Sequence, residues 1–370
     1  MSEKKFFPVS RPSLRGNELK YVTDAVKSGW ISSLGAYVTR LETEFANYCG
    51  VRHAVSVSNG TVALHLALIS AGVGPGDEVI VPDLSFIATA NAVLMAGAKP
   101  VFCDVDPITL CMDPESAAER ITGRTRAIIP VHLYGHPAAM IDLMNLAERH
   151  GLFVIEDAAE AHGATLDGQR VGGLGHGATF SFYANKNMTT GEGGMIVTNS
   201  DAFASRCRHL RDHAMSSERR YWHDMLGYNY RMTNLQAAIG CAQFEQLESF
   251  LKRRRMLFSG YQSRLFGVNG IQLNRTLPNA TNAYWMVCLE VEGMNREARD
   301  DLIVRLRRDG VDTRPYFFPM SDMPYLDDAD TPVSHAASAR GINLPTSADY
   351  TSSDLDEICS VLIDHFQRGW

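Results

Sequence analysis

The sequence predicts an α/β protein with a mostly parallel central sheet, followed by a smaller α+β region. Short hydrophobic segments rich in β-branched residues alternate with helical patterns over the first two thirds of the chain, and this alternation is typical of buried parallel sheets. After about residue 250, strands become fewer and turns more frequent. The 370-residue length also allows two domains. We therefore expect a large α/β domain over residues 1–249, including an N-terminal arm, and a small α+β domain over residues 250–370.

The elements of the large domain follow one another in a regular order. Short apolar runs predict strands at residues 54–57, 78–81, 99–103, 127–131 and 152–155. Helices are predicted between them at residues 63–69, 88–97 and 140–149. Two further strands are predicted at residues 179–183 and 195–198. A long helical region is expected to begin near the basic run at residues 252–255.

Composition excludes several classes of protein. The net charge of −7 and the lack of a basic stripe argue against a nucleic-acid partner. The seven cysteines are scattered and never spaced Cys-x-x-Cys, a pattern that favours reduced thiols over disulfides or a zinc site. No apolar run approaches about 18 residues, so we expect neither membrane insertion nor secretion. These features predict a cytoplasmic protein of the size of an enzyme.

A single lysine lies at the centre of a predicted hairpin. Lys186 stands between the strand at residues 179–183 and a glycine-rich turn at residues 189–194. The glycine-rich backbone can approach a ligand closely. Together with the single nearby amine, this arrangement suits a lysine that forms an imine. On this segment alone, the alternative is a solvated lysine in an ordinary hairpin.

A second motif links the first predicted strand to the first predicted helix, with the sequence Ser-Asn-Gly-Thr at residues 58–61. The backbone around Gly60, the Thr61 hydroxyl and the helix dipole would together bind an anion, most simply a phosphate. Alternatively, Asn59 or Thr61 only caps the helix.

Acidic residues directly follow the predicted strand at residues 152–155. Side chains at this carboxyl edge face the ligand crevice of an open sheet. Asp157 could there hold a proton on a heterocyclic nitrogen through a charge-assisted hydrogen bond. An acidic helix N-terminus is one alternative, and a metal site is another, disfavoured because no second cluster of suitable spacing is present. The candidate metal ligands are Glu156, Asp157, Glu160 and His162.

Two further segments are candidate binding elements. Phe86 follows the strand at residues 78–81 and either stacks on a flat cofactor or belongs to the core. The polar and aromatic segment at residues 227–234 precedes a helix expected to begin near Leu235. This segment is either an ordinary capped loop or one that reaches a neighbouring subunit.

The motifs together resemble the nucleotide-sugar aminotransferases of the DegT–StrS type. The resemblance rests on the order Asn-Gly-Thr, Glu-Asp-Ala-Ala-Glu-Ala, Ser-Phe-x-x-x-Lys, Thr-Thr-Gly-Glu-Gly-Gly and Asn-Tyr-Arg-Met-Thr-Asn. It extends over residues 30–346. It implies fold type I, the aspartate aminotransferase-like fold of pyridoxal-phosphate-dependent transferases.

The resemblance also implies a cofactor and a role for each motif. Pyridoxal 5'-phosphate would be attached to Lys186, which would also move a proton during the reaction, and Asp157 would keep the pyridine nitrogen protonated. The other implied cofactor contacts are Gly60, Thr61, Phe86, Glu160, Ser181 and Asn229. Asn229 would come from the neighbouring subunit, which implies a homodimer with shared active sites.

The substrates implied by the resemblance are L-glutamate and a keto-deoxy nucleotide sugar. Residues 180–194 and 219–222 are most similar to the branch that aminates GDP-4-keto-6-deoxymannose at C4, a step in polysaccharide (O-antigen) biosynthesis. The implied substrate contacts are Trp30, Ser33, Gly35, Arg219 and Arg220. Two guanidinium groups suit a diphosphate, although Arg219 and Arg220 could also belong to a solvated charge run.

One departure and three alternatives accompany this prediction. The branch has histidines near the positions that Phe318 and Ser321 occupy here, so the acceptor could be a different keto nucleotide sugar. A sugar dehydratase of the same fold would have histidine in place of Lys186. A non-catalytic protein on this scaffold predicts a broken set of site residues. A nicotinamide dehydrogenase would need Gly-x-Gly-x-x-Gly after the first strand, which is lacking.

Overall fold

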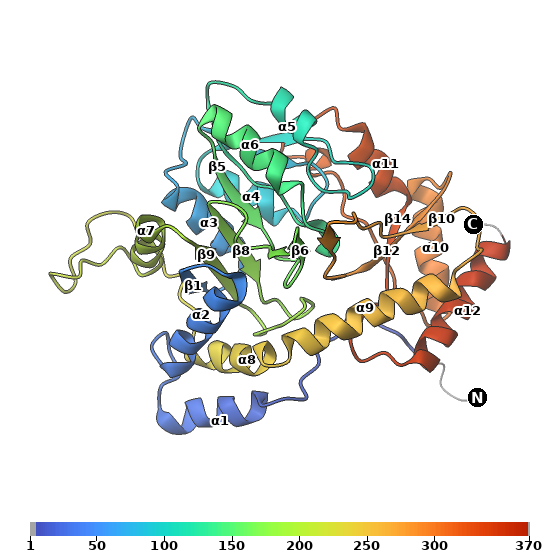
Figure 1. The fold of residues 1–370 in the computed structure, drawn as a ribbon, viewed down its shortest axis with the longest axis horizontal. Helices are drawn as coiled ribbons and strands as arrows, with labels where there is room; N and C mark the ends of the chain where they lie inside the picture. The colour runs from blue at the N-terminus through green and yellow to red at the C-terminus, as the bar shows by residue number, and fades with distance from the viewer. Residues whose placement is uncertain (1–4, 369–370) are drawn as a thin grey trace.

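The computed structural model describes residues 5–368 and has a seven-stranded sheet at its centre (Figure 1). Across the sheet the strands are β1 (His53–Val57), β9 (Gly194–Thr198), β8 (Gly177–Ser181), β5 (Phe153–Asp157), β4 (Thr125–Ile128), β2 (Glu78–Pro82) and β3 (Lys99–Cys103). Strand β9 runs antiparallel to both of its neighbours, and the other six strands are parallel. The predicted α/β fold with a mostly parallel sheet is confirmed.

Both faces of the sheet are covered by helices, which explains why its strands are continuously hydrophobic. Successive side chains of a strand point to opposite faces. In β2, Val79 and Val81 therefore pack with α3 (Gly60–Ser70) and α4 (Ala88–Met95). Ile80 packs on the other face with α6 (Met140–His150).

Further helices surround the sheet edge that begins with β1. They are α1 (Glu18–Ser28), α2 (Ala36–Cys49), α7 (Asp201–Arg211) and α8 (Asn234–Phe244). A short helix, α5 (Pro114–Glu119), lies beside α6, and the strand pair β6 (Thr165–Leu166) and β7 (Gln169–Arg170) meets β11 (Ala280–Thr281). Between α7 and α8 the chain leaves the body of the molecule, at the left of Figure 1. We call residues 212–233 the projecting loop.

The C-terminal part has its own antiparallel sheet, in the order β10 (Ile271–Leu273), β12 (Val287–Val291), β14 (Gly341–Leu344) and β13 (Arg314–Pro315). Helices α9 (Leu247–Arg264), α10 (Arg296–Arg308), α11 (Pro332–Arg340) and α12 (Ser352–Arg368) accompany it. Among residues 5–368, no helix combines the length and the apolar character that crossing a bilayer requires.

The long helix α9 begins earlier than the basic run suggested, and it connects the two parts of the molecule. Its early residue Leu251 packs in the core beneath β9, whereas its later residues Leu257 and Tyr261 pack with the C-terminal sheet. The predicted boundary at residue 250 thus falls inside a continuous helix. Phe7, from the N-terminal arm, also packs in the C-terminal core. The two-domain division stays a prediction.

The local predictions match the structure, with small shifts at the ends of elements. The strand expected at residues 127–131 ends at Ile128. Pro130 has no N–H group to donate to a neighbouring strand, which explains the early end. Strand β8 likewise ends at Ser181, before the turn that carries Lys186.

Candidate active site

A cavity of about 660 Å³ lies where the carboxyl end of the central sheet meets the C-terminal sheet. Open parallel sheets bind their ligands at this end of the strands. The cavity lining includes seven residues that the sequence had singled out, namely Gly60, Thr61, Phe86, Asp157, Glu160, Ser181 and Lys186. Residues from widely separated motifs are therefore brought to one place.

Asp157 is the last residue of β5, and its carboxylate is buried and fixed by two donors. The Thr89 hydroxyl donates to Oδ2 at 2.8 Å, and the Ala159 N–H donates to Oδ1 at 3.2 Å. Burial raises the pKa of Asp157, while these two hydrogen bonds and the charge of Lys186 lower it. The side chain is therefore held in one orientation toward the cavity.

Lys186 lies in the turn between β8 and β9, whose start is fixed by a hydrogen bond from the Lys186 N–H to the Tyr183 carbonyl at 3.0 Å. Its Nζ atom lies 3.5 Å from Glu160 Oε1 and 3.9 Å from the centre of the Trp285 ring. Burial lowers the pKa of Lys186, and the carboxylates of Glu160 and Asp157 oppose this effect. Desolvation favours the neutral amine, which is the nucleophilic form.

Glu160 is buried beside Lys186, and the Tyr134 N–H donates to its Oε2 atom at 2.9 Å. Burial raises the pKa of Glu160 to about 7, although Lys186 and the Tyr134 N–H lower it. The opposite shifts of the two groups favour a pair in which both are neutral. A neutral Glu160 can donate a hydrogen bond, which a carboxylate cannot.

The start of α3 forms a cradle for an anion. Asn59 caps the helix by accepting a hydrogen bond from the Val62 N–H at 3.0 Å. The capping role that the sequence suggested as an alternative therefore applies to Asn59. Gly60 and Thr61 face the cavity with the N-terminal end of the helix, where N–H groups and the dipole favour negative charge. A Cβ atom at Gly60 would lie 2.7 Å from Ser181 Cβ, so only glycine permits this close approach.

Three chemically different groups thus surround one cavity. A buried amine, a buried carboxylate and an anion cradle correspond to the aldehyde, the ring nitrogen and the phosphate of pyridoxal 5'-phosphate. The residues present therefore fit this cofactor. Phe86, which is 54% exposed and lies 5.8 Å from the Phe317 ring, gives the cavity an aromatic wall.

The remaining expected cofactor contact lies elsewhere. Asn229 belongs to the projecting loop, and its Oδ1 atom accepts hydrogen bonds from Arg231 at 2.8 and 3.1 Å. Within residues 5–368 it does not line the cavity of its own chain.

The expected substrate contacts also lie outside this cavity, within the part of the chain that the structure describes. They are Trp30, Ser33, Gly35, Arg219 and Arg220. The Trp30 carbonyl accepts a hydrogen bond from Asn234 Nδ2 at 2.6 Å, and a Cβ atom at Gly35 would collide with the Asn234 side chain. The segment around Trp30 and Gly35 is thereby fixed beside the start of α8.

The two arginines are exposed on the projecting loop. The Arg219 guanidinium lies 4.5 Å from the centre of the Trp222 ring, and that of Arg220 lies 5.0 Å from the centre of the Tyr221 ring. These contacts keep the aromatic rings beside the cations, but they leave the charges accessible to a ligand.

The residues considered as metal ligands make other contacts in the structure. Glu156 accepts hydrogen bonds from the N–H groups of Gly172 and Gly175, at 2.8 and 2.7 Å. His162 lies among the rings of Phe180 and Phe182, and burial lowers its pKa to about 3. No group of three or more possible metal ligands is found among residues 5–368.

The sequence did not reveal several residues of the cavity. Trp285 covers Lys186, Thr89 orients Asp157, and Arg314 and Phe317 line the C-terminal side. Aromatic richness around residues 316–318 was the available signal for Phe317. No local pattern indicated Trp285, because its contact with Lys186 joins segments far apart in the chain.

The positions where the histidines were expected contribute little to this cavity. Ser321 is buried, and it donates its N–H and its hydroxyl to the carboxylate of Asp83, both at 2.7 Å. Phe318 packs beside the Arg296 guanidinium, 5.0 Å from the ring centre. Among residues 316–321, only Phe317 lines the cavity.

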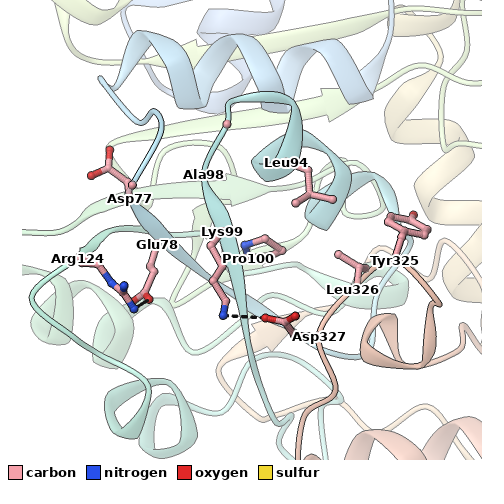
Figure 2. Close-up of a pocket in the computed structure, with 12 residues that line it drawn as sticks. Asp77, Glu78, Leu94, Ala98, Lys99, Pro100, Arg124, Tyr325, Leu326 and Asp327 are labelled. Carbon is pink, nitrogen blue, oxygen red and sulfur yellow. Dashed lines mark hydrogen bonds and ion pairs between the residues drawn. The ribbon is translucent and has the colours of Figure 1, made fainter.

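A second cavity of about 340 Å³ lies at the other end of the strands, where β2 and β3 begin. Figure 2 shows Lys99 and Asp327 pointing toward one another. The Lys99 Nζ and Asp327 Oδ2 atoms lie 2.7 Å apart. Arg124 is paired with Glu78 in the same way. Asp77, which also lines this second cavity, contacts Arg126. The charged side chains of the second cavity are thus paired, and the cavity that contains Lys186 is the candidate active site.

The parallel sheet, the buried lysine and carboxylate, and the anion cradle define a pyridoxal-phosphate-dependent enzyme of fold type I. Residues 12–363 match the DegT/DnrJ/EryC1/StrS aminotransferase family. The chain belongs to this family, and it is a sugar aminotransferase with pyridoxal phosphate as cofactor.

Known relatives cover almost the whole chain. GDP-perosamine synthase of Caulobacter vibrioides is 45% identical over 367 residues, which are 98% of this chain and 99% of the relative. GDP-perosamine synthase of Vibrio cholerae is 40% identical and covers 97% of this chain and 99% of its own. The crystal structure of the aminotransferase TlmJ from Streptoalloteichus hindustanus matches with a TM-score of 0.92 and 31% identity, over 97% of this chain and 98% of that one.

Proposed function

We propose that the enzyme transfers the amino group of L-glutamate to C4 of GDP-4-keto-6-deoxymannose, giving GDP-perosamine. The observation that carries the proposal is the meeting of Lys186 and Asp157 in one cavity of a chain whose relatives include GDP-perosamine synthases. We infer that the product serves polysaccharide (O-antigen) biosynthesis. A cytoplasmic location is supported by the seven cysteines, all of them free and buried.

The proposed roles of the cavity residues follow from their chemistry. Lys186 attaches the cofactor, and its amine then carries a proton between two carbon atoms of the reacting complex. When bound, the cofactor supplies an electron-withdrawing ring that stabilises negative charge on the substrate carbon. Asp157 holds the proton on the ring nitrogen, and its two hydrogen bonds keep it aimed there.

The other cavity residues would bind and orient the cofactor. Gly60, Thr61 and Ser181 would surround its phosphate, and Phe86 would pack on its ring. Glu160 would lie near the phenolic oxygen. Because burial raises the pKa of Glu160 to about 7, the neutral acid can donate a hydrogen bond to that oxygen rather than repel it.

We further propose a homodimer whose active sites are shared. Asn229, Arg219 and Arg220 belong to the projecting loop and lie outside the cavity of their own chain. The same loop exposes large apolar side chains, Tyr221 at 76% and Leu226 at 77%, and such surfaces are typical of protein interfaces. In this arrangement Asn229 completes the phosphate site of the partner, and the arginines bind the nucleotide diphosphate together with the segment that holds Trp30, Ser33 and Gly35.

Arg314 is proposed as the cation that receives a substrate anion within the cavity. Among residues 5–368 it is the only arginine that lines the cavity, and it has no ion pair there. The cavity also contains Asp157, Glu160 and Glu192, so an anionic substrate needs a fixed positive charge on the opposite side.

A different keto nucleotide sugar is the second candidate acceptor, favoured by Phe318 and Ser321 in place of the expected histidines. A sugar dehydratase is disfavoured because Lys186 is present. The test is incubation of the purified enzyme with glutamate and a panel of 3-keto and 4-keto nucleotide sugars, followed by mass spectrometry. We expect one new amine, from GDP-4-keto-6-deoxymannose. Amination of another sugar alone would contradict the proposed acceptor.

A further inference from the structure

We propose that Trp285 is a positioning residue for Lys186, and that its ring holds the ε-amine whenever the lysine is not attached to the cofactor. This inference rests on the proposed role of Lys186. A lysine that leaves the cofactor and later returns must stay close to the reacting carbons, because a flexible four-carbon chain otherwise samples many rotamers.

The first observation is the contact itself. Lys186 Nζ lies 3.9 Å from the centre of the Trp285 ring, and the lysine side chain is only 11% exposed. Glu160 provides its other near neighbour, with Oε1 at 3.5 Å. An aromatic face attracts an ammonium ion most strongly when both are shielded from water. Trp285 is itself buried and lines the cavity.

The second observation is that Trp285 is held at both its ring and its backbone. Its Nε1–H group donates to the Asn185 carbonyl at 2.8 Å, directly before Lys186 in the chain. The Arg254 guanidinium donates to the Trp285 carbonyl at 2.8 Å. The rings of Tyr134 and Phe317 are nearly parallel to the indole, at interplanar angles of 11° and 18°. The ring is thus fixed both to the lysine turn and to the C-terminal part.

The third observation is backbone strain on both sides of this contact. Tyr284, which precedes Trp285, has a φ of +47°, and Tyr134 has a φ of +53°. Both are non-glycine residues in the left-handed region, a conformation that persists only where the surroundings impose it. The two segments also approach closely, because a Cβ atom at Gly135 would lie 2.7 Å from the Tyr284 nitrogen. The strained turns present the indole to Lys186 and the Tyr134 N–H to Glu160.

These contacts have a consequence for proton movement. During the proposed reaction, the free Lys186 amine would accept one proton from the reacting complex, hold it as an ammonium ion, and later release that proton to the complex. Burial favours the neutral amine, whereas the π face of Trp285 favours the ammonium. The ring therefore stabilises the charge at the step when Lys186 carries the proton.

The test uses the full-length enzyme loaded with pyridoxamine 5'-phosphate, in which Lys186 is free. The rate of acetylation of Lys186 is followed by mass spectrometry as a function of pH. Only the neutral amine is acetylated, so the midpoint of this profile reports the pKa of Lys186. We expect the midpoint to lie at lower pH in Trp285→Leu, because leucine still covers the lysine with an apolar side chain but lacks the π face that stabilises the ammonium. Trp285→Phe should retain much of the wild-type midpoint. Phe266→Leu, at an aromatic residue that is 90% exposed, is the matched control and should not differ from wild type.

Fluorinated tryptophans separate the electrostatic effect of the π face from the effect of side-chain shape. They also provide a test that does not depend on the folding of a substituted variant. Each added fluorine weakens the negative face of the ring with little change in size. The midpoint should therefore fall stepwise with fluorination in wild type and stay constant in Trp285→Phe, which lacks the relevant ring. A midpoint that is unchanged or raised in both the fluorinated enzyme and Trp285→Leu would overturn the proposal.

A kinetic measurement complements the pH profile. The half-reaction with glutamate should be roughly tenfold slower in Trp285→Leu, with partial recovery in Trp285→Phe. The acetylation profile does not require turnover with any nucleotide sugar. A wrong acceptor in the proposed function would therefore leave this inference testable, and failure of the profile would leave the acceptor assignment intact.

Discussion

The cavity and the projecting loop differ in how their functional candidates are held. Lys186 and Asp157 are buried at the end of the central sheet, and each has hydrogen-bond or ring partners within 4 Å. Arg219 and Arg220 are exposed on the projecting loop, and their near neighbours are the rings of the same loop. The groups proposed to react are thus brought together within one chain, whereas the groups expected to recognise the nucleotide lie away from that chain's cavity.

Chemistry and recognition therefore have separate structural requirements. Groups that transfer protons need a fixed geometry and low exposure, which a buried sheet edge provides. A nucleotide diphosphate needs accessible cations, which a loop can bring to it from a neighbouring subunit. Substitutions in the two regions should therefore have different effects.

The largest effect is expected from Lys186→Ala. Loss of the amine removes both the cofactor attachment and the proton carrier, so turnover should fall by roughly 10⁴-fold or more. The measurement is the steady-state rate together with the visible absorption band of the bound cofactor, which borohydride should abolish only in wild type. Lys252→Ala, at an exposed lysine of α9, is the control and should be fully active. A variant that lacked Lys186 but kept the covalent cofactor would refute the assignment.

Asp157→Asn should come next, with turnover lowered roughly 100-fold or more. The amide keeps the size of the side chain and can still accept a hydrogen bond from Thr89, so the cofactor should remain bound. It cannot keep the ring nitrogen protonated, because it carries no negative charge. The ratio of cofactor to protein checks binding, and single-turnover rates check chemistry. A near-normal rate would remove Asp157 from the proposed mechanism.

A double substitution, Arg219→Gln with Arg220→Gln, should act on recognition alone. We expect KM for the nucleotide sugar to rise roughly tenfold to a hundredfold, since each charge-assisted hydrogen bond to phosphate is worth about 1.5–3 kcal/mol. The half-reaction with glutamate should be unchanged. Arg206→Gln removes an exposed guanidinium from α7 and is the matched control.

Mixed dimers sharpen the comparison by testing the proposed sharing directly. Asn229→Ala protein mixed in equal amount with Lys186→Ala protein should recover about a quarter of wild-type activity, because half of the dimers would contain one intact site. Each variant alone should be nearly inactive. No recovery after verified subunit exchange would argue against action of Asn229 across the interface.

The smallest effect is expected for Glu160→Gln and concerns stability. The pKa of Glu160 is raised by burial from 4.5 to about 7, so the folded chain holds this proton more tightly than the unfolded chain. Its stabilising contribution is complete below pH of about 4.5 and is lost as the pH rises through about 7. Glutamine does not titrate. Relative to wild type, the variant should therefore gain about 2–3 kcal/mol at most in the free energy of unfolding between pH 5 and 8, measured by urea denaturation. A constant difference across this range would contradict the raised pKa.

The sheet could be predicted because its signals are local. Asp157 directly follows an apolar strand and Lys186 lies in a glycine-rich turn, but each segment alone allowed other interpretations, and the roles proposed for both residues rest on the resemblance of the combined motifs. The insertion of β9 between β1 and β8 has no local signal, since strand order depends on long-range pairing. Trp285 could not be predicted as a cavity residue for a similar reason. Its orientation depends on the left-handed conformation of Tyr284 and on contacts with residues about 100 positions away.

Helix α9 is a rigid connection between the central sheet and the C-terminal sheet. Its 18 residues span about 27 Å, and Figure 1 shows it running from α8 to α12. Leu251 is anchored in one core and Tyr261 in the other. Any rotation of one half against the other would have to bend this helix or pull one of these side chains out of its core. Helix α9 therefore limits how far the cavity between the two sheets can widen.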